Sequence, residues 1–169
     1  MLYACFAALA AALLGLDQWF KAWVTANLPL GETMAFIPGL MQLRTVHNYG
    51  AAWSSFSGMR YLLIFVTSAI VFAVALAVVL RIVRHPLGLL AASLIISGGL
   101  GNIIDRARFG YVVDMFDLTF INYPVFNIAD ICIVCGCFLG CAYYLWFYEK
   151  YDRKVKKTDG EADADNNGN

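Results

Sequence analysis

The stretch YLLIFVTSAIVFAVALAVVL (Tyr61–Leu80) contains twenty residues without a charge, and Arg60 and Arg81 bound it. A helix needs about 20 apolar residues to cross the ~30 Å hydrocarbon core of a bilayer. The whole chain has the same character, because 61% of its 169 residues are hydrophobic. Only 14% are charged, whereas soluble domains carry about 25%. The sequence therefore predicts an integral membrane protein.

Three further uncharged runs have membrane length: Met1–Leu16, Pro86–Ile104 and Ile131–Tyr148. We expect one integral-membrane domain over residues 1–157, followed by a disordered cytoplasmic tail at 158–169, which is acidic and polar. The expected membrane helices lie at about 2–24, 60–82, 86–105 and 126–148, with outer connections at about 25–59 and 106–125. A cleavable signal peptide is the alternative for the first run, but no Lys or Arg precedes it.

The basic residues predict an orientation. Arg81 and Arg84 lie between helices two and three, and five Lys or Arg residues follow helix four. By the positive-inside rule these ends, and both termini, are cytoplasmic. The bias is modest, since five basic residues lie on the other side, among them Lys21 and Arg44. Both long connections then lie at the outer face.

The outer connections contain strand-like segments, Leu40–Asn48 and Tyr111–Asp117, in which β-branched and aromatic residues alternate with polar ones. Glycines such as Gly39 and Gly110 punctuate them. We expect short strands that form a small sheet on the membrane surface. The edge of such a sheet can pair with an extended peptide.

Polar residues recur at helical spacing on three of the four helices, at their outer ends. The sets are Asp17 and Lys21; Asn102, Asp105 and Arg106; and Asn127 and Asp130. Residues three or four positions apart share one helix face, so each helix turns a polar patch inward at the same depth. The structural alternative is an intrahelical ion pair for the first set and a helix-end charge cluster for Asp105 and Arg106.

Asp114 and Asp130 have no basic residue close by in the sequence. Two carboxylates brought close together share a proton, because both cannot easily ionise. One can then activate water as a general base, while the protonated one polarises a carbonyl group or protonates the leaving amine. This pair indicates aspartic-protease chemistry. Asp117 is a competing candidate, although it lies nearer the loop.

Other chemistries are disfavoured. The two histidines, His47 and His85, are expected on opposite sides of the membrane, which argues against a histidine-based metal site or triad. Cys132 and Cys135 form a C-x-x-C pattern within one membrane helix, a poor geometry for zinc. The sequence predicts no metal site and no cofactor, and we interpret the glycines of SGGLGN (Ser97–Asn102) as helix-packing residues. Zero net charge without a basic patch argues against nucleic acid.

Two non-peptidase alternatives remain. The clustered acids are also compatible with a proton- or cation-coupled small membrane transporter. A non-enzymatic assembly protein whose acids bind a partner is the other alternative. Against the transporter, the polar residues gather at one face rather than near the bilayer midplane.

The sequence resembles the lipoprotein signal peptidase family, also called signal peptidase II. Five blocks carry the resemblance, in the order and at the spacing of the family: LDQWFK (Leu16–Lys21), HNYGAAW (His47–Trp53), GGLGNIIDR (Gly98–Arg106), YVVDMF (Tyr111–Phe116) and FNIAD (Phe126–Asp130). Two departures are Trp53, where Phe is usual, and Ile131, where Ser is common.

The resemblance implies four transmembrane helices with a small periplasmic β-cradle between helices one and two. It implies an aspartic endopeptidase of the bacterial inner membrane that cleaves prolipoproteins before the diacylglyceryl-modified cysteine, at the periplasmic face. Its partners would be lipid-modified prolipoproteins and membrane lipids, with no obligate protein partner. The catalytic pair maps onto Asp114 and Asp130. Substrate-binding or supporting residues map onto Asp17, Lys21, Asn48, Gly50, Asn102, Asp105, Arg106 and Asn127.

Overall fold

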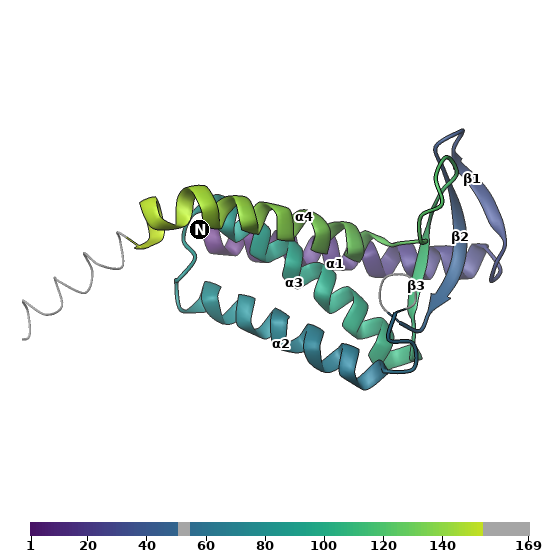
Figure 1. Cartoon of the computed structure of the whole chain (residues 1–169), viewed down its shortest axis with the longest axis horizontal. Coiled ribbons are helices and arrows are strands. Elements are labelled where there is room, and N and C mark those ends of the chain that lie inside the picture. The colour runs from purple at the N-terminus through teal and green to yellow at the C-terminus, as the bar shows by residue number, and fades with distance from the viewer. Residues whose placement is uncertain (51–54, 154–169) are drawn as a thin grey trace, which may run out of the picture.

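The computed structural model describes residues 1–50 and 55–153 of the protein. Trp53 and the tail at 158–169 therefore lie outside the described residues. Four long helices run side by side, and a small sheet lies across one end of the bundle (Figure 1). The helices are α1 (Leu2–Asn27), α2 (Arg60–Val79), α3 (Pro86–Phe109) and α4 (Ile128–Tyr143), and α4 continues as a π-helical segment, η2 (Tyr144–Arg153). The expected class, four membrane-length helices with a small sheet, is confirmed.

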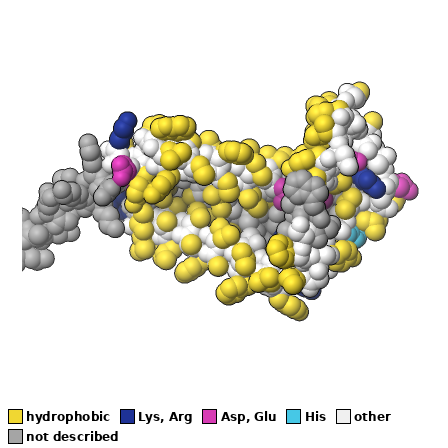
Figure 2. Space-filling model, viewed as in Figure 1, with side chains coloured by type: hydrophobic (Ala, Val, Ile, Leu, Met, Phe, Trp, Pro, Cys, Tyr) yellow, Lys and Arg dark blue, Asp and Glu magenta, His cyan; other side chains and the backbone are white. Residues whose placement is uncertain are grey.

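The outer surface of the bundle is apolar. Large side chains point away from the protein on α2 and α4, where Phe72 is 68% exposed and Phe138 is 73% exposed. Figure 2 shows this hydrophobic surface along the helices, with charged side chains at the two ends. Large exposed apolar surfaces of this kind mark contact with a membrane or a partner. Together with the helix lengths, this surface fits a bilayer.

The glycines of α3 face its neighbours. A Cβ atom at Gly98 would collide with the backbone oxygen of Ala129 on α4, and one at Gly99 would collide with Val71 on α2. A Cβ at Gly101 would lie 2.6 Å from the Oδ2 atom of Asp17 on α1. The absence of side chains thus lets α3 approach three helices at once. This supports the interpretation of the SGGLGN segment as a packing element.

The sheet is antiparallel with the order β1–β2–β3, and it contains β1 (Thr33–Ile37), β2 (Met41–Asn48) and β3 (Val112–Leu118). We expected only two strands; β1 went unpredicted because TMAFI is exposed throughout and shows no clear alternation. β1 and β2 come from the connection between α1 and α2, whereas β3 follows α3. The cradle is therefore built from both connections, and β2 with β3 brings Asn48 near Asp114.

A hydrophobic core joins the sheet to the end of α1. Val24 and Leu28 of this segment pack with Leu43, Met115 and Phe116 of the sheet, and all are buried. Strand β3 is also held on its outer side, because Phe116 and Phe126 exchange backbone hydrogen bonds. The start of α4 is thereby fixed against β3.

The other end of the bundle has its own polar contact. Asp152, which is 3% exposed, accepts hydrogen bonds from the backbone N–H groups of Arg84 and His85 and from the hydroxyl of Tyr143. His85 caps α3 by accepting a hydrogen bond from Leu87 N. His47 lies on β2, so the two histidines are at opposite ends of the bundle, as expected.

Candidate active site

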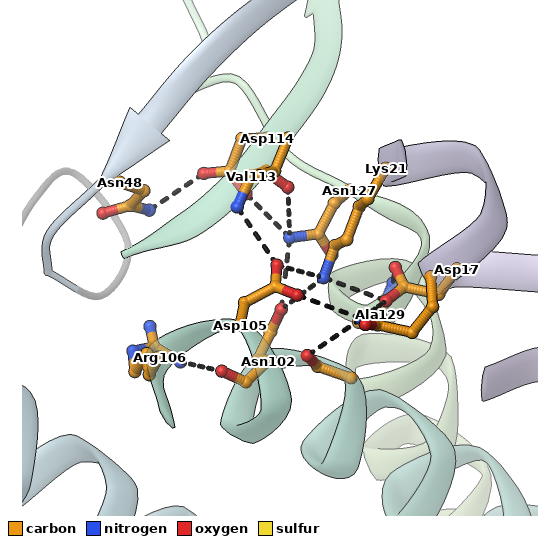
Figure 3. Close-up of polar contacts among 12 residues, drawn as sticks. Asp17, Lys21, Asn48, Asn102, Asp105, Arg106, Val113, Asp114, Asn127 and Ala129 are labelled. Carbon is orange, nitrogen blue, oxygen red and sulfur yellow. Dashed lines mark hydrogen bonds and ion pairs between the residues drawn. The ribbon is translucent and has the colours of Figure 1, made fainter. Parts of the chain in front are cut away.

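Polar side chains of α1, β2, α3, β3 and α4 meet beneath the sheet at one end of the bundle (Figure 3). The buried members are Asp17 and Lys21 of α1, Asn102, Asp105 and Arg106 of α3, Asp114 of β3, and Asn127 at the start of α4. Buried charges are costly unless they are paired and hydrogen-bonded. The contacts described below supply those partners.

Asp130 is held at the first turn of α4 by a capping box. The Asn127 side chain accepts a hydrogen bond from Asp130 N at 2.8 Å, and Asn127 N donates to Asp130 Oδ2 at 3.2 Å. The other carboxylate oxygen, Oδ1, accepts a hydrogen bond from Asn102 Nδ2 at 2.8 Å. Backbone donors and the helix dipole both favour a negative charge at this position.

Asp114 is more deeply buried, with 2% of its surface exposed. Its Oδ1 atom accepts a hydrogen bond from Asn127 Nδ2 at 2.7 Å, and its Oδ2 atom accepts one from Asn48 Nδ2 at 2.9 Å. Burial, and then the negative charge of Asp130, raise the pKa of Asp114 from 3.8 to about 7, although hydrogen bonds from Asn48 and Asn127 oppose the rise. A carboxyl group with this pKa can hold a proton at neutral pH.

Asparagines connect the two aspartates. Asn127 Nδ2 also lies 3.2 Å from Asn102 Oδ1, so Asp114, Asn127, Asn102 and Asp130 form one hydrogen-bonded network. Each of the four carboxylate oxygens accepts one N–H group. The network orients both carboxylates, and the charge of Asp130 also acts on Asp114.

A buried ion cluster lies behind this network. Lys21 Nζ is 2.9 Å from Asp17 Oδ2 and 3.0 Å from Asp105 Oδ2, and it donates to Asn102 Oδ1 at 3.3 Å. The intrahelical pair expected for Asp17 and Lys21 therefore exists within a larger cluster. The ion pair of Asp105 is with Lys21 of α1, not with its neighbour Arg106.

A cavity of about 350 Å³ opens beside Asp130. Asn102, Arg106 and Asp130 form its polar side, and the rest of the lining is largely apolar: Leu63, Thr67, Val112, Tyr123, Pro124, Val125, Phe126, Ile133 and Val134. Arg106 Nη2 donates to Gly50 O at 2.7 Å, which holds the end of the β2 segment over this region. The cavity can hold a chain with apolar groups next to a hydrolysable polar bond.

All ten residues expected at the site lie in or against this network. Asp117, the competing candidate, instead accepts a hydrogen bond from Gln42 Nε2 at 2.8 Å across the β2–β3 pair. Ile131 lies on the outer surface of α4, where it is 43% exposed. Cys132 is buried, while Cys135 is exposed on the same helix. Within residues 1–50 and 55–153, no three His, Cys, Asp or Glu side chains are grouped to hold a metal ion.

Gln18 is the site residue that sequence reasoning missed. Its Nε2 atom lies 3.2 Å from Asp17 Oδ2, 3.0 Å from Asp105 Oδ1 and 3.3 Å from Gly101 O. Its place within LDQWFK was one available signal. The spacing argument passed over it because it considered only Asp17 and Lys21 on this helix, although Gln18 lies three positions before Lys21 and shares a face with it.

Comparisons with known proteins show which family the chain is similar to. A family model described as signal peptidase (SPase) II matches residues 9–146. The lipoprotein signal peptidase of Lactococcus lactis subsp. lactis (strain IL1403) is 47% identical over 120 residues, which cover 71% of this chain and 79% of the relative. That of Streptococcus thermophilus (strain CNRZ 1066) is 41% identical over 128 residues, 76% of this chain and 84% of the relative.

Solved structures share the fold. A chain described as a bacterial membrane enzyme superposes with a TM-score of 0.80 and 28% identity, covering 84% of this chain and 88% of the other. A second bacterial membrane enzyme structure gives a TM-score of 0.78, also at 28% identity, and covers 85% and 94% of the two chains.

Proposed function

The chain belongs to the signal peptidase II family, and from this premise we propose that Asp114 and Asp130 are its catalytic pair. As a lipoprotein signal peptidase, an aspartic peptidase, it removes signal peptides from prolipoproteins, and it is a multi-pass membrane protein of bacteria. The observation that carries the proposal is the asparagine network that joins both aspartates beside the cavity.

In the proposed mechanism Asp130 is the general base. It borders the cavity, and the start of α4 favours its ionised form through Asn127 N and the helix dipole. Asp114 carries the proton, because burial beside a second carboxylate raises its pKa to about 7. A water molecule between them loses a proton to Asp130 and adds to the scissile carbonyl carbon, while Asp114 protonates the carbonyl oxygen. Asp130 then returns its proton to the leaving amine as the C–N bond breaks, and Asp114 recovers its own proton from the diol.

We further propose that cleavage occurs before a diacylglyceryl-modified cysteine. The cavity supports this choice, since its polar wall of Asn102, Arg106 and Asp130 adjoins apolar residues of α2 and α4 such as Leu63 and Val134. The peptide would lie on the polar side, and the acyl chains would remain among apolar side chains. Membrane lipids are the remaining partner that this surface supports.

The proposed orientation places the active site at the outer, periplasmic face and both termini in the cytoplasm. Arg81 and Arg84 support it, because they lie at the end of the bundle opposite the aspartates, near Asp152. Lys150 on η2 lies at that same end. Basic residues in short connections favour the cytoplasmic side.

The transporter alternative lacks a supporting observation. Along the described parts of the four helices, the buried polar side chains between the two polar ends are Ser93 and Ser97, which carry no charge. Ion pathways normally place ionisable groups inside the bilayer.

The test is cleavage of a purified diacylglyceryl-prolipoprotein by the protein in detergent, with and without a metal chelator. We expect Asp114→Asn and Asp130→Asn to lose at least 10³-fold in rate, in the range seen when a member of a catalytic unit is removed. Asp117→Asn is the matched control on β3 and should stay near the wild-type rate. Activity in either site variant, with a normal helical content, would remove that residue from the catalytic pair.

A further inference from the structure

Each proposed catalytic aspartate follows a residue whose backbone is tethered to a buried carboxylate. Ala129 N, one residue before Asp130, donates to Asp17 Oδ1 at 2.9 Å. Val113 N, one residue before Asp114, donates to Asp105 Oδ2 at 3.2 Å. The positions of α4 and β3 at the site are thus set by carboxylates of α1 and α3.

The two tethering carboxylates are joined to each other by two side chains. Lys21 contacts Asp17 and Asp105 through Nζ, at 2.9 and 3.0 Å, and its third interaction is with Asn102. An ammonium group has three N–H donors, so Lys21 has none left. Gln18 supplies the second bridge, at 3.2 Å from Asp17 and 3.0 Å from Asp105.

The neutrality of Gln18 matters in this cluster. Two carboxylates and one ammonium already leave one negative charge, and Gln18 adds N–H donors without adding a charge. Its side chain is partly buried and borders a cavity of about 310 Å³ between α1 and α3, together with Lys21, Asp105 and Arg108. This cavity shares Lys21 and Asp105 with the cluster but neither aspartate of the proposed pair. Gln18 can therefore act on the reaction only through other residues.

We propose that Gln18 is a positioning residue for the aspartate pair: by holding Asp17 and Asp105 together, it sets the separation of Asp130 and Asp114. This inference rests on the proposed catalytic roles of the two aspartates. Misplacing reacting groups by about 1 Å can cost on the order of 10²-fold in rate. A change at Gln18 should therefore lower kcat rather than substrate binding.

The experiment compares Gln18→Leu with Gln42→Leu in the full-length protein in detergent. Both glutamines donate Nε2 to an aspartate, but the partner of Gln42 is Asp117 on the sheet. We expect Gln18→Leu to lower kcat by about 10- to 100-fold with KM within about 3-fold, as expected for misplaced reacting groups. Gln42→Leu should leave kcat unchanged. Thermal unfolding and size-exclusion profiles are recorded for each variant.

Gln18→Glu adds a pH readout that a purely structural role does not move. The charged groups around this position are Asp17 and Lys21 of α1 and Asp105 of α3, with the Gly101 carbonyl beside them. An ionised carboxylate cannot donate to them, whereas a protonated one can. The activity of Gln18→Glu relative to wild type should therefore rise as the pH falls, and that of Gln18→Leu should not.

Three results would overturn the inference. Normal kcat in folded Gln18→Leu would leave Gln18 with no role in catalysis, and a rise in KM alone would assign it to substrate binding. Aggregation of both Gln18 variants would make its role one of folding. A wild-type protein that fails to cleave the prolipoprotein would instead count against the proposed function itself.

Discussion

Asn127 and Asp130 hydrogen-bond to each other twice, since the backbone N–H of each donates to the side chain of the other, at 3.2 and 2.8 Å. This reciprocal pair begins α4 and, through Asn127 Nδ2, also reaches Asp114 at 2.7 Å. The residues that start the helix are thus the residues that connect the two carboxylates. Helix capping and the proposed chemistry share the same atoms.

Replacing Asn127 by Ser should separate these two roles. Serine is a good N-cap, so the helix start remains satisfied, but its short side chain cannot reach Asp114 and Asn102. We expect the melting temperature of Asn127→Ser to stay near wild type while kcat falls at least 10-fold, as for a lost orienting contact. Asn127→Ala should lose about 1 kcal/mol in addition. Full cleavage activity in the Ser variant would mean that Asn127 acts only as the N-cap of α4 and does not orient the aspartates.

The cleavage rate should fall as the pH is raised above about 7. The proposed general acid, Asp114, has a pKa raised to about 7, mainly by burial and by the charge of Asp130. Because kcat/KM reports ionisations of the free enzyme, its alkaline limb should lie near pH 7. A pH series with one substrate in one detergent measures it. A rate that stays constant up to pH 9 would contradict a protonated Asp114.

The thermal stability of the protein should also depend on the ionisation of Asp114. The pKa of Asp114 is raised from its ordinary value of 3.8, which applies to the unfolded chain, to about 7 in the folded protein. Between these pH values the folded state therefore binds a proton that the unfolded state has lost. The free energy of unfolding therefore decreases as the pH rises from about 4 to 7. Asp114→Asn cannot ionise, and we expect its melting temperature to depend less on pH in this window. Parallel curves for both proteins would refute the shift.

Gly98→Ala should loosen the bundle. A Cβ atom there collides with the backbone oxygen of Ala129, which a rotamer change cannot relieve, so we expect a loss of about 1–3 kcal/mol from overpacking. Gly15→Ala on α1 is the matched control, because its Cβ would have no neighbour within 4 Å. Thermal unfolding in one detergent compares the two. Equal melting temperatures of the two variants would mean that α3 and α4 can move apart to accommodate the Cβ atom at position 98 without a loss of stability.

The helices and most of the site could be predicted from the sequence because their signals are local. An uncharged run shows a membrane helix, and the spacing of Asp17 with Lys21 or Asn102 with Asp105 places each pair on one face. The Asn-x-x-Asp pattern at Asn127 is also a local capping signal, although the spacing argument uses it only to place a polar patch.

The remainder depends on contacts between distant segments. The ion pair of Asp105 with Lys21, and the bridge made by Gln18, arise only when α1 packs against the glycine face of α3. Strand β1 has no inward-facing pattern, since all five of its residues are exposed, and it is placed by its pairing with β2 at the edge of the described sheet. No spacing within one element contains this information.

The origin of β3 in the second connection has a consequence for biosynthesis. The β1–β2 hairpin emerges from the ribosome early, but its partner strand is made only after α2 and α3, and Asp130 later still. The second half of the chain contains both aspartates with Asn102 and Asn127, whereas the contact of Asp114 with Asn48 comes from the first half. A partly synthesised protein therefore lacks the complete network. With the proposed roles of Asp114 and Asp130, the peptidase would become competent only after its last helix, α4, has been made.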